Sequence, residues 1–360
     1  MTMKILFYIN AIHQGGAERV MVNLANQFSE KGDKVVLVTS FEDHWEYPVS
    51  EGVERHSFEE KDFQKDGFLR QNMKWTLNLR ETIKKYRPDV VISFMAEPNF
   101  RTILAAAGLK VKSIISVRND PNKEYPNFVY RILAKVLYLF ADGIVFQTED
   151  AKKWFLSMIQ RKSEIIYNQV DQKFYECPKC DTPKGIVTCG RLVEQKNQAM
   201  LVDAFSMIAD DIHENLYIYG EGELRTNLEK QIRDKKLQDR IFLPGDIKNV
   251  EEMLSKAAIF VLPSDYEGMP NALMEAMAVG VPCISTDCPC GGPLMLFRND
   301  ADFLVPIGNT QQMAEKIKSL LLDKDKREEN AKQMKDYSQA FTPERIFKKW
   351  DEYVSMIVAK

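Results

Sequence analysis

The chain of 360 residues contains no run of eighteen apolar residues. Its longest apolar candidate, 127–146, is interrupted by Arg131, Lys135 and Asp142, so we expect no membrane-spanning helix. The opening residues lead directly into a strand-like segment and lack the basic, apolar and small-residue parts of a secretory signal. The pattern therefore predicts a protein of the cytoplasm.

Cysteine and histidine are scarce, with six and four residues. Cys177 and Cys180 could join Cys288 and Cys290 in a zinc site, because paired thiolates are the usual structural ligands. The first spacing is only half of a zinc motif, however, and the second has a single intervening residue, which favours reduced thiols. No cluster of Asp, Glu or His suggests another metal site. We expect no metal and no resident cofactor.

Two further classes of protein are disfavoured. The net charge is -3 and no nucleic-acid motif occurs, so we expect no nucleic-acid partner. Neither half has Gly-Xaa-Gly-Xaa-Xaa-Gly after its opening strand, which disfavours a Rossmann dehydrogenase.

Positive charge is concentrated in one segment. Residues 68–162 carry seventeen Lys plus Arg and eight Asp plus Glu, a net of +9. Aromatic side chains are interleaved with these charges: Trp75, Phe100, Tyr125, Phe128, Tyr130, Tyr138, Trp154 and Phe155. The combination suits an anionic membrane surface and a lipid diphosphate. The alternative is a solvated helix face with the aromatic residues in the core.

Short runs rich in Val and Ile alternate with helical stretches, which is typical of parallel sheets wrapped by helices. The expected strands are 4–10, 34–39, 89–94, 113–117 and 143–147, then 185–189, 216–219, 241–243, 259–262, 282–286 and 303–305. A chain of this length exceeds one core. Residues 169–184 lack periodicity and are the expected linker between two doubly wound α/β domains. Ligands of such sheets bind at the carboxyl ends of the strands.

Two carboxylates flank a loop-to-helix junction in Glu267-Gly-Met-Pro-Asn-Ala-Leu-Met-Glu275. We expect Asn271 to cap a helix over 272–277 that stops at Gly280. Unpaired backbone N–H groups at the start of that helix can hold a diphosphate. Glu275 lies on the helix and Glu267 in the loop, so each can reach a different ring of one ligand.

Cations and glycines follow other strands. Arg191 and Lys196 stand in a loop before a helix that begins near Asn197, where they can neutralise a diphosphate. Gly15 and Gly16 follow the first strand and permit close approach of the backbone to a phosphate or an acceptor.

Five blocks of sequence, in order, resemble glycosyltransferase family 4, the retaining GT-B enzymes. The blocks are Gly15-Gly16-Ala17-Glu18-Arg19, Gly190-Arg191-Leu192 with Gln195-Lys196, Tyr219-Gly220-Glu221-Gly222, Pro263-Ser264-Asp265-Tyr266-Glu267-Gly268, and Glu275-Ala276-Met277-Ala278-Val279-Gly280-Val281-Pro282. Together with Ser116-Val117-Arg118-Asn119-Asp120-Pro121, the first block looks most like bacterial enzymes that extend lipid-linked surface polysaccharides, in the GalNAc-transferase-like group.

The resemblance implies a GT-B fold, in which two Rossmann-like domains face a cleft. It divides the chain into an acceptor-side domain at 1–170, a nucleotide-sugar domain at 171–342 and a helix at 343–360 that crosses back. It implies a hexosyltransferase that uses a nucleotide sugar, most simply UDP-linked, and a lipid-diphosphate-linked glycan acceptor. Such an enzyme would work peripherally at the inner face of the cell membrane.

The resemblance also assigns roles to residues. Arg191 and Lys196 correspond to the pair that neutralises the leaving diphosphate. Glu267 resembles the residue that contacts the donor sugar, and Glu275 the one that binds the ribose. The remaining binding residues are expected to contribute mainly backbone groups: Gly190, Gly220, Gly245, Asp246, Ile247, Gly268, Met269, Pro270, Asn271 and Ala272.

One position departs from the family pattern. Many members have a histidine just after the strand that is expected to end at Val117, and this chain has Arg118-Asn119-Asp120 there. A role based on histidine cannot be transferred. We therefore expect Asp120 to orient or deprotonate the acceptor hydroxyl and Asn119 to hold the sugar.

The expected mechanism is retaining transfer, with electrostatic stabilisation of the leaving diphosphate and no protein nucleophile. Two alternatives remain open: a sugar-nucleotide epimerase of the GT-B architecture, which needs no acceptor, and a non-catalytic nucleotide-sugar-binding subunit.

Overall fold

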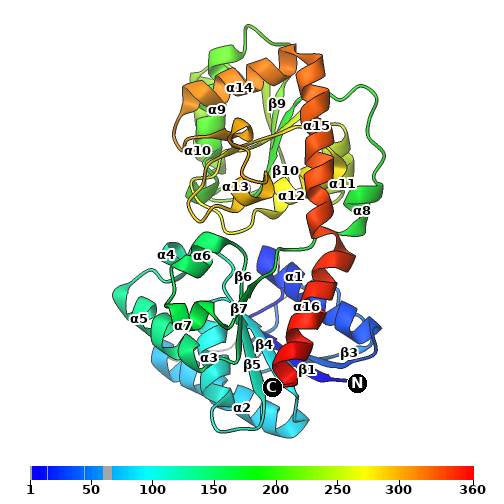
Figure 1. Ribbon diagram of the computed structural model, residues 1–360. Coiled ribbons are helices and arrows are strands. Elements are labelled where there is room, and N and C mark those ends of the chain that lie inside the picture. The colour runs from blue at the N-terminus through cyan, green and yellow to red at the C-terminus, as the bar shows by residue number, and fades with distance from the viewer. Residues whose placement is uncertain (1, 14, 44, 60–66) are drawn as a thin grey trace. The chain divides into compact units, whose positions relative to one another are not determined.

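The computed structural model describes residues 2–13, 15–43, 45–59 and 67–360. The chain divides into two compact units, which we call unit 1 (residues 1–168 and 344–360) and unit 2 (residues 169–343). Each unit is a parallel sheet with helices on its faces (Figure 1). The expected α/β class with two doubly wound domains is confirmed.

Unit 1 is built on seven strands in the order β3-β2-β1-β4-β5-β6-β7, all paired in parallel. Phe7 in the inner strand β1 pairs with Leu37 on one side and Ile92 on the other. The strands are β1 (Lys4–Ile9), β2 (Lys34–Thr39), β3 (Val53–Ser57), β4 (Val90–Phe94), β5 (Lys112–Ser116), β6 (Gly143–Phe146) and β7 (Ser163–Ile165).

Helices cover both faces of this sheet. Tyr8 packs in a buried cluster with Leu79 of α2, whereas its neighbour Phe7 faces Phe28 of α1, with ring centroids 6.1 Å apart. Successive strand residues therefore anchor opposite helix layers. The helices are α1 (Gly16–Glu30), α2 (Phe68–Tyr86), α3 (Ala96–Ala106), α4 (Pro121–Glu124), α5 (Phe128–Leu137), η1 (Tyr138–Phe140), α6 (Glu149–Lys153), α7 (Ser157–Gln160) and α16 (Pro343–Val358).

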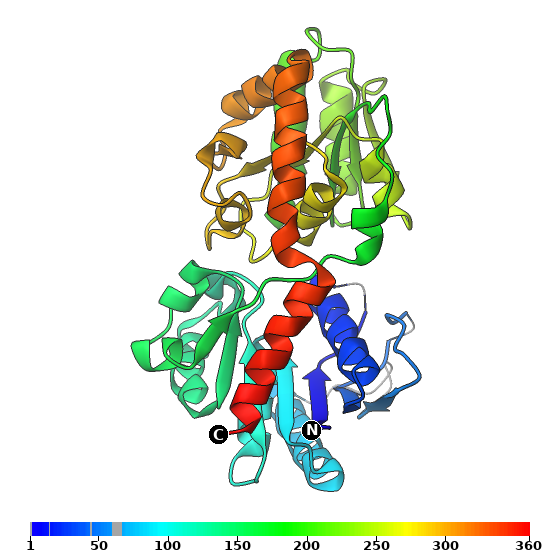
Figure 2. The ribbon, with the colours of Figure 1, turned by 45° about the vertical axis from the view of Figure 1, so that its right-hand side comes forward.

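The last helix, α16, belongs to unit 1. Figure 2 shows it beside α1, and the ring centroids of Phe28 and Phe347 lie 5.0 Å apart. The Tyr353 hydroxyl accepts from the Ile144 N–H at 2.7 Å and donates to the Lys162 carbonyl at 2.7 Å. These contacts attach the end of the chain to β6 and to the residue before β7.

Unit 2 has six strands in the order β10-β9-β8-β11-β12-β13, again in parallel. Its core joins the sheet to α9 and α14 through Phe205, Ile259 and Ile317. The strands are β8 (Ile186–Cys189), β9 (Leu216–Tyr219), β10 (Ile241–Gly245), β11 (Ile259–Leu262), β12 (Cys283–Thr286) and β13 (Leu304–Val305).

The helices of unit 2 include one inside the segment that was expected to be an irregular linker. This helix, α8, buries Phe174 and packs on α12. One buried aromatic residue was too weak a signal to reveal it. The helices are α8 (Gln172–Glu176), η2 (Glu194–Lys196), α9 (Gln198–Ile208), α10 (Arg225–Asp234), α11 (Val250–Ser255), α12 (Asn271–Val279), α13 (Gly292–Leu296), η3 (Ala301–Phe303), α14 (Thr310–Leu322), α15 (Lys324–Ser338) and η4 (Gln339–Phe341).

All of the expected strands are present, and two were missed. β3 reads Val-Glu-Arg-His-Ser and β7 has three residues, and both lie at edges of the sheet of unit 1. An edge strand is partly solvated, so its sequence lacks the apolar run by which the inner strands were recognised.

The expectation that aromatic residues of 68–162 form a surface is wrong for most of them. Tyr125, Tyr138 and Phe155 are buried and pack on one another, with the rings of Tyr138 and Phe155 stacked at 5.5 Å. Trp75 and Phe100 are buried as well, whereas Phe128 is exposed. Within the described residues, no helix is both long enough and apolar enough to cross a membrane.

Candidate active site

Three glycines bring neighbouring backbones together at the carboxyl edge of unit 2. Gly190, Gly220 and Gly245 lie at the ends of the adjacent strands β8, β9 and β10. The Gly220 N–H donates to the Gly245 carbonyl at 2.9 Å, and a Cβ on Gly220 would overlap the Gly190 carbonyl oxygen. Gly220 has φ +126°, so only glycine suits this position. Asp246 is exposed and Ile247 half-buried just beyond.

The loop that follows Gly190 is fastened to the loop that follows β11. Asn197 has a left-handed conformation, and its side chain caps α9 by accepting from the Met200 N–H. Its amide group also donates to the Asp265 carboxylate at 2.7 Å, while the Asp265 N–H donates to the Gln195 carbonyl at 2.9 Å. These bonds fix Lys196 beside Glu267.

Lys196 and Glu267 form a direct ion pair. The lysine Nζ donates to Glu267 Oε1 at 2.5 Å, and Ser264 Oγ donates to the same oxygen at 2.8 Å. Glu267 is buried, so these two partners, rather than water, compensate its negative charge. Arg191 is exposed and makes no ion pair within the described part of the chain, although its carbonyl accepts from Gln198 at 3.0 Å.

Helix α12 begins directly after this pair. The expectation that Asn271 caps it is wrong, because Asn271 is the first helical residue and Pro270 occupies the capping position. A proline at that point lacks an N–H and fixes the chain direction. The helix ends at Gly280, whose φ of +86° confirms the expected stop. Glu275 lies buried on α12, and Gly268 and Met269 are buried ahead of it.

A second glycine loop supports the start of α12, and the sequence analysis did not assign it a role. A Cβ on Gly292, the first residue of α13, would overlap the Gly268 carbonyl oxygen. Thr286 and Cys288 both donate to the Ser264 carbonyl, Cys288 at 3.1 Å. Burial raises the pKa of Cys288 to about 12, so this thiol stays protonated and acts as a donor. The Gly291-Gly292-Pro293 run was the available signal.

In unit 1, the glycine pair opens α1. Gly15 is the capping residue and Gly16 the first residue of the helix, and the Arg19 N–H donates to the Gly15 carbonyl at 3.1 Å. A Cβ on Gly15 would overlap the Glu18 carboxylate. The absence of a side chain at Gly15 therefore leaves room for the Glu18 carboxylate in the first turn of the helix. The helix dipole favours a negative charge at this place.

Asn119 and Asp120 form a short turn after β5. Asp120 is buried, and its Oδ1 caps α4 by accepting from the Asn122 N–H at 2.9 Å. Asn119 Oδ1 accepts from the Asp120 N–H at 2.9 Å. The carboxylate expected to act on the acceptor thus has one oxygen engaged in a helix cap.

Glu124 holds this turn, and its role was missed. Its Oε2 accepts from the backbone N–H groups of Arg118 and Asn119 at 3.1 and 3.0 Å. Burial raises the pKa of Glu124 to about 7. The Arg118 guanidinium is buried 3.6 Å from the Phe94 ring centroid, and burial lowers its pKa to about 9. Arg118 is therefore a packing residue, and the turn presents Asn119 and Asp120.

Metal ligation finds no geometric support in the part of the chain that the structure describes. No group of three His, Cys, Asp or Glu residues there could hold an ion. The six cysteines all lie in the described part of the chain and form no disulfide, and Cys283 is buried.

Two family models match the chain in succession. "Glycosyltransferase Family 4" matches residues 14–174, and "Glycosyl transferases group 1" matches residues 171–340.

Curated relatives match along the whole length. Two are N-acetylgalactosaminyltransferases of Campylobacter jejuni, whose names give GalNAc-containing diphospho-undecaprenol substrates and an alpha linkage to position 4. One is 27% identical over 99% of both chains, and the other is 27% identical over 95% of this chain and 97% of its own. The amylovoran biosynthesis glycosyltransferase AmsD of Erwinia amylovora is 24% identical over 98% of this chain and 99% of its own.

Solved structures share the fold. HepE of Anabaena in complex with UDP has a TM-score of 0.82 at 18% identity, covering 98% of this chain and all of the other. Sucrose-phosphate synthase of Thermosynechococcus elongatus has a TM-score of 0.82 at 17% identity over 99% of this chain and all of the other.

Proposed function

The chain belongs to the glycosyltransferases of family 4 and group 1, and from this premise we propose that it moves a hexose or N-acetylhexosamine from a UDP-sugar to a lipid-diphosphate-linked glycan. Transfer would retain the anomeric configuration and serve bacterial surface polysaccharide synthesis. The single observation that carries the proposal is the pairing of Lys196 with the buried Glu267 at the start of α12.

The donor would bind to unit 2. The backbones that meet at Gly190, Gly220 and Gly245 leave no side chain to obstruct a nucleotide at the carboxyl edge. The N–H groups that open α12 would face the diphosphate, because a helix start attracts anions. Glu275 would then take the ribose hydroxyls, since a carboxylate accepts two hydrogen bonds from a diol.

Lys196 would change partner during the reaction. In the free protein it neutralises Glu267. A diphosphate that binds beside Lys196 would share the positive charge of this lysine with Glu267. Arg191, which has no ion-pair partner in the described chain, would supply a second positive charge to the diphosphate. As the bond to the sugar breaks, charge accumulates on the leaving oxygen, where these cations stabilise it most.

Glu267 would act on the sugar. Once Lys196 turns toward the diphosphate, the Glu267 carboxylate is no longer compensated by the lysine and lies beside a sugar ring that becomes cationic. It would stabilise that ring and receive hydrogen bonds from its hydroxyls. No covalent bond to the protein is needed, since the acceptor would attack from the face that the diphosphate leaves.

The acceptor side is assigned to unit 1. Asp120 would orient the acceptor hydroxyl with its remaining oxygen, and Asn119 would hold a sugar. The proton would leave with the departing diphosphate oxygen. The Campylobacter relatives are named for diphospho-undecaprenol acceptors, which supports an acceptor of that chemical class. Their names print an alpha linkage, and an alpha linkage formed from an α-linked UDP-sugar would mean retention.

The test is direct. The purified protein is incubated with UDP-GalNAc, UDP-GlcNAc, UDP-galactose or UDP-glucose and a short-chain lipid-diphosphate acceptor, and the products are weighed by mass spectrometry. We expect one donor to add its sugar to the acceptor. Conversion of the donor into another sugar nucleotide without acceptor would indicate an epimerase, and binding without turnover a non-catalytic subunit.

A further inference from the structure

Helix α5 exposes the apolar face that a helix of a globular protein normally buries. Of its ten residues, only Ala134 is buried. Phe128 is 75% exposed, and Phe140 of the following η1 is 71% exposed. We call the exposed apolar residues of this segment the α5 strip: Phe128, Val129, Ile132, Leu133, Val136 and Phe140.

The strip forms one continuous face with a basic border. The spacings of three and four residues place its members on adjacent positions of the helix surface. Arg131 is exposed, and Lys135 Nζ lies 4.5 Å from the Trp154 ring centroid. At 3.6 residues per turn, these two cations lie beside Phe128 and Ile132, along one edge of the strip.

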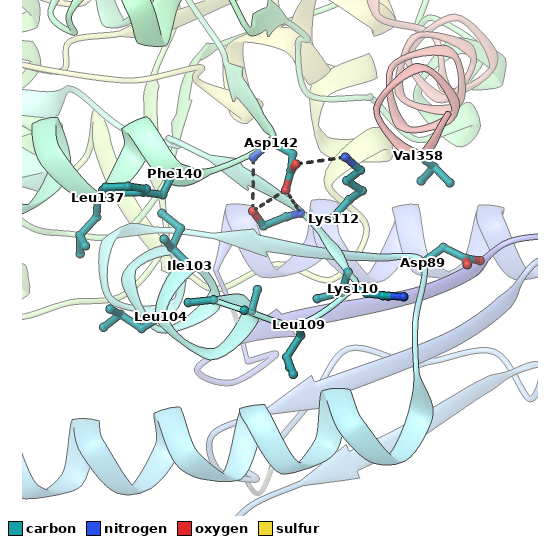
Figure 3. Close-up of a pocket in the computed structure, with 15 residues that line it drawn as sticks. Asp89, Ile103, Leu104, Leu109, Lys110, Lys112, Leu137, Phe140, Asp142 and Val358 are labelled. Carbon is teal, nitrogen blue, oxygen red and sulfur yellow. Dashed lines mark hydrogen bonds and ion pairs between the residues drawn. The ribbon is translucent and has the colours of Figure 1, made fainter. Parts of the chain in front are cut away.

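A depression lined by both apolar and charged residues continues the strip at the far end of α5. Its volume is about 840 Å³. In Figure 3, Leu137 and Phe140 lie on the same side as Ile103 and Leu104, and Leu109 lies lower in the view. Lys112, which pairs with Asp142 at 3.4 Å, lies higher in the view than Lys110. Leu104 is itself half exposed. Apolar surface thus passes from α5 and η1 onto α3.

We propose that the α5 strip and this depression form a surface that docks onto an anionic lipid bilayer. The inference rests on the proposed function, whose acceptor is held in a membrane, and names the surface that would meet it. An amphipathic helix lies in the plane of the interface with its apolar side chains at the acyl boundary. Arg131 and Lys135 would then lie among anionic headgroups, with Lys110 at the depression.

Charge favours a bilayer over a second copy of the chain. A symmetric dimer through the strip would place its basic border close to the same border of the partner. Arg131, Lys135 and Lys110 lie at the strip and the depression, so two copies that faced each other would bring these cations together, whereas an anionic surface attracts them.

The test uses the full-length protein and sedimentation with vesicles, without nucleotide or acceptor. Vesicles of phosphatidylcholine alone are compared with vesicles that also contain phosphatidylglycerol. The strip variant is Phe128→Gln with Phe140→Gln, and the matched control is Met207→Gln with Leu322→Gln, which removes exposed apolar side chains of unit 2. A third variant, Leu69→Gln with Met73→Gln, removes exposed apolar side chains of α2.

We expect wild type to bind the vesicles that contain phosphatidylglycerol. The affinity of the strip variant for the same vesicles should be lower by about tenfold or more. The control and the α2 variant should bind like wild type. Equal binding by the strip variant, or an equal loss in the control or the α2 variant, overturns the proposal. So does a wild-type dimer in solution that the strip substitutions convert to monomer. Transfer to a water-soluble acceptor, measured on the same proteins, reports the proposed function separately from docking.

Discussion

Lys196 Nζ lies 2.5 Å from Oε1 of Glu267, and the Ser264 hydroxyl donates to the same carboxylate oxygen. The glutamate is buried while the lysine is partly exposed. The pair therefore has two properties in one contact: it stabilises the loop ahead of α12, and it holds a cation where a diphosphate is proposed to bind.

Lys196→Ala and Arg191→Ala should weaken UDP binding to a similar extent, but only Lys196→Ala should lower the stability of the protein. Each should weaken UDP affinity about tenfold or more, because a hydrogen bond to a charged group contributes about 1.5 to 3 kcal/mol. Lys196→Ala should also lower the free energy of unfolding of unit 2, since it leaves Glu267 buried without its counter-charge. Titration calorimetry and calorimetric melting measure the two effects. Unchanged UDP affinity in both variants would place the diphosphate elsewhere.

The two glutamates should give different kinetic signatures. Glu275→Ala removes the proposed contact to the ribose, which would be made both before and during reaction, so mainly the donor KM should rise. Glu267→Gln keeps the size of the side chain but removes its charge, and kcat should fall roughly a hundredfold. Steady-state kinetics with varied donor separate the two. A Glu267→Gln enzyme with the wild-type kcat would reduce this residue to a partner of Lys196.

Gly292→Ala should disturb the proposed donor site through the loop that contains Gly268. Its new Cβ would overlap the Gly268 carbonyl oxygen, so the loop that carries Glu267 must shift. We expect a higher donor KM and a lower melting temperature. Gly67→Ala is the matched control, because no described residue other than its chain neighbours lies within 4 Å of its Cβ position. Equal behaviour of the two variants would show that the contact between α13 and the Gly268 loop is unimportant.

Glu124 should make the stability of unit 1 depend on pH. Burial raises its pKa from 4.5 to about 7, so the folded state keeps the proton up to a higher pH than the unfolded state does. The stabilisation is complete below pH 4.5 and is lost as the pH rises toward 7. The free energy of unfolding of wild type, relative to that of Glu124→Gln, should therefore fall across this window and stay level above it.

Tryptophan fluorescence is suited to that comparison. The four tryptophans, Trp45, Trp75, Trp154 and Trp350, all belong to unit 1, so urea unfolding followed by fluorescence reports this unit alone. A difference between wild type and Glu124→Gln that does not vary with pH would contradict the raised pKa.

The central strands and the end of α12 were predictable because their signals are local. A buried parallel strand is a short apolar run, and Gly280 ends its helix by its own backbone conformation. Strand β3 escaped because an edge strand shares the polarity of a loop. Pro270 occupies the capping position that was assigned to Asn271. A proline next to a good capping residue leaves the first helical residue ambiguous in sequence.

Long-range contacts could not be predicted. The approach of Gly292 to Gly268 joins two loops that follow different strands, and Glu124 binds the Asn119 turn through backbone groups that leave no trace in sequence. The aromatic residues around Tyr138 alternate with charges along the chain, so a buried cluster and an exposed face have the same pattern. Only packing showed that Phe128 faces solvent and Tyr138 does not.

Retaining transfer from a UDP-sugar fixes the anomeric configuration of the transferred sugar, which can be measured. The protein is incubated with the preferred UDP-sugar and the lipid-diphosphate acceptor, and the new linkage is read from its proton coupling in the nuclear magnetic resonance spectrum of the product. We expect wild type to add the sugar in the α configuration and Glu267→Gln to form much less of the same product. A β-linked product would rule out retention, and no transfer from any UDP-sugar to such an acceptor would rule out the proposed function.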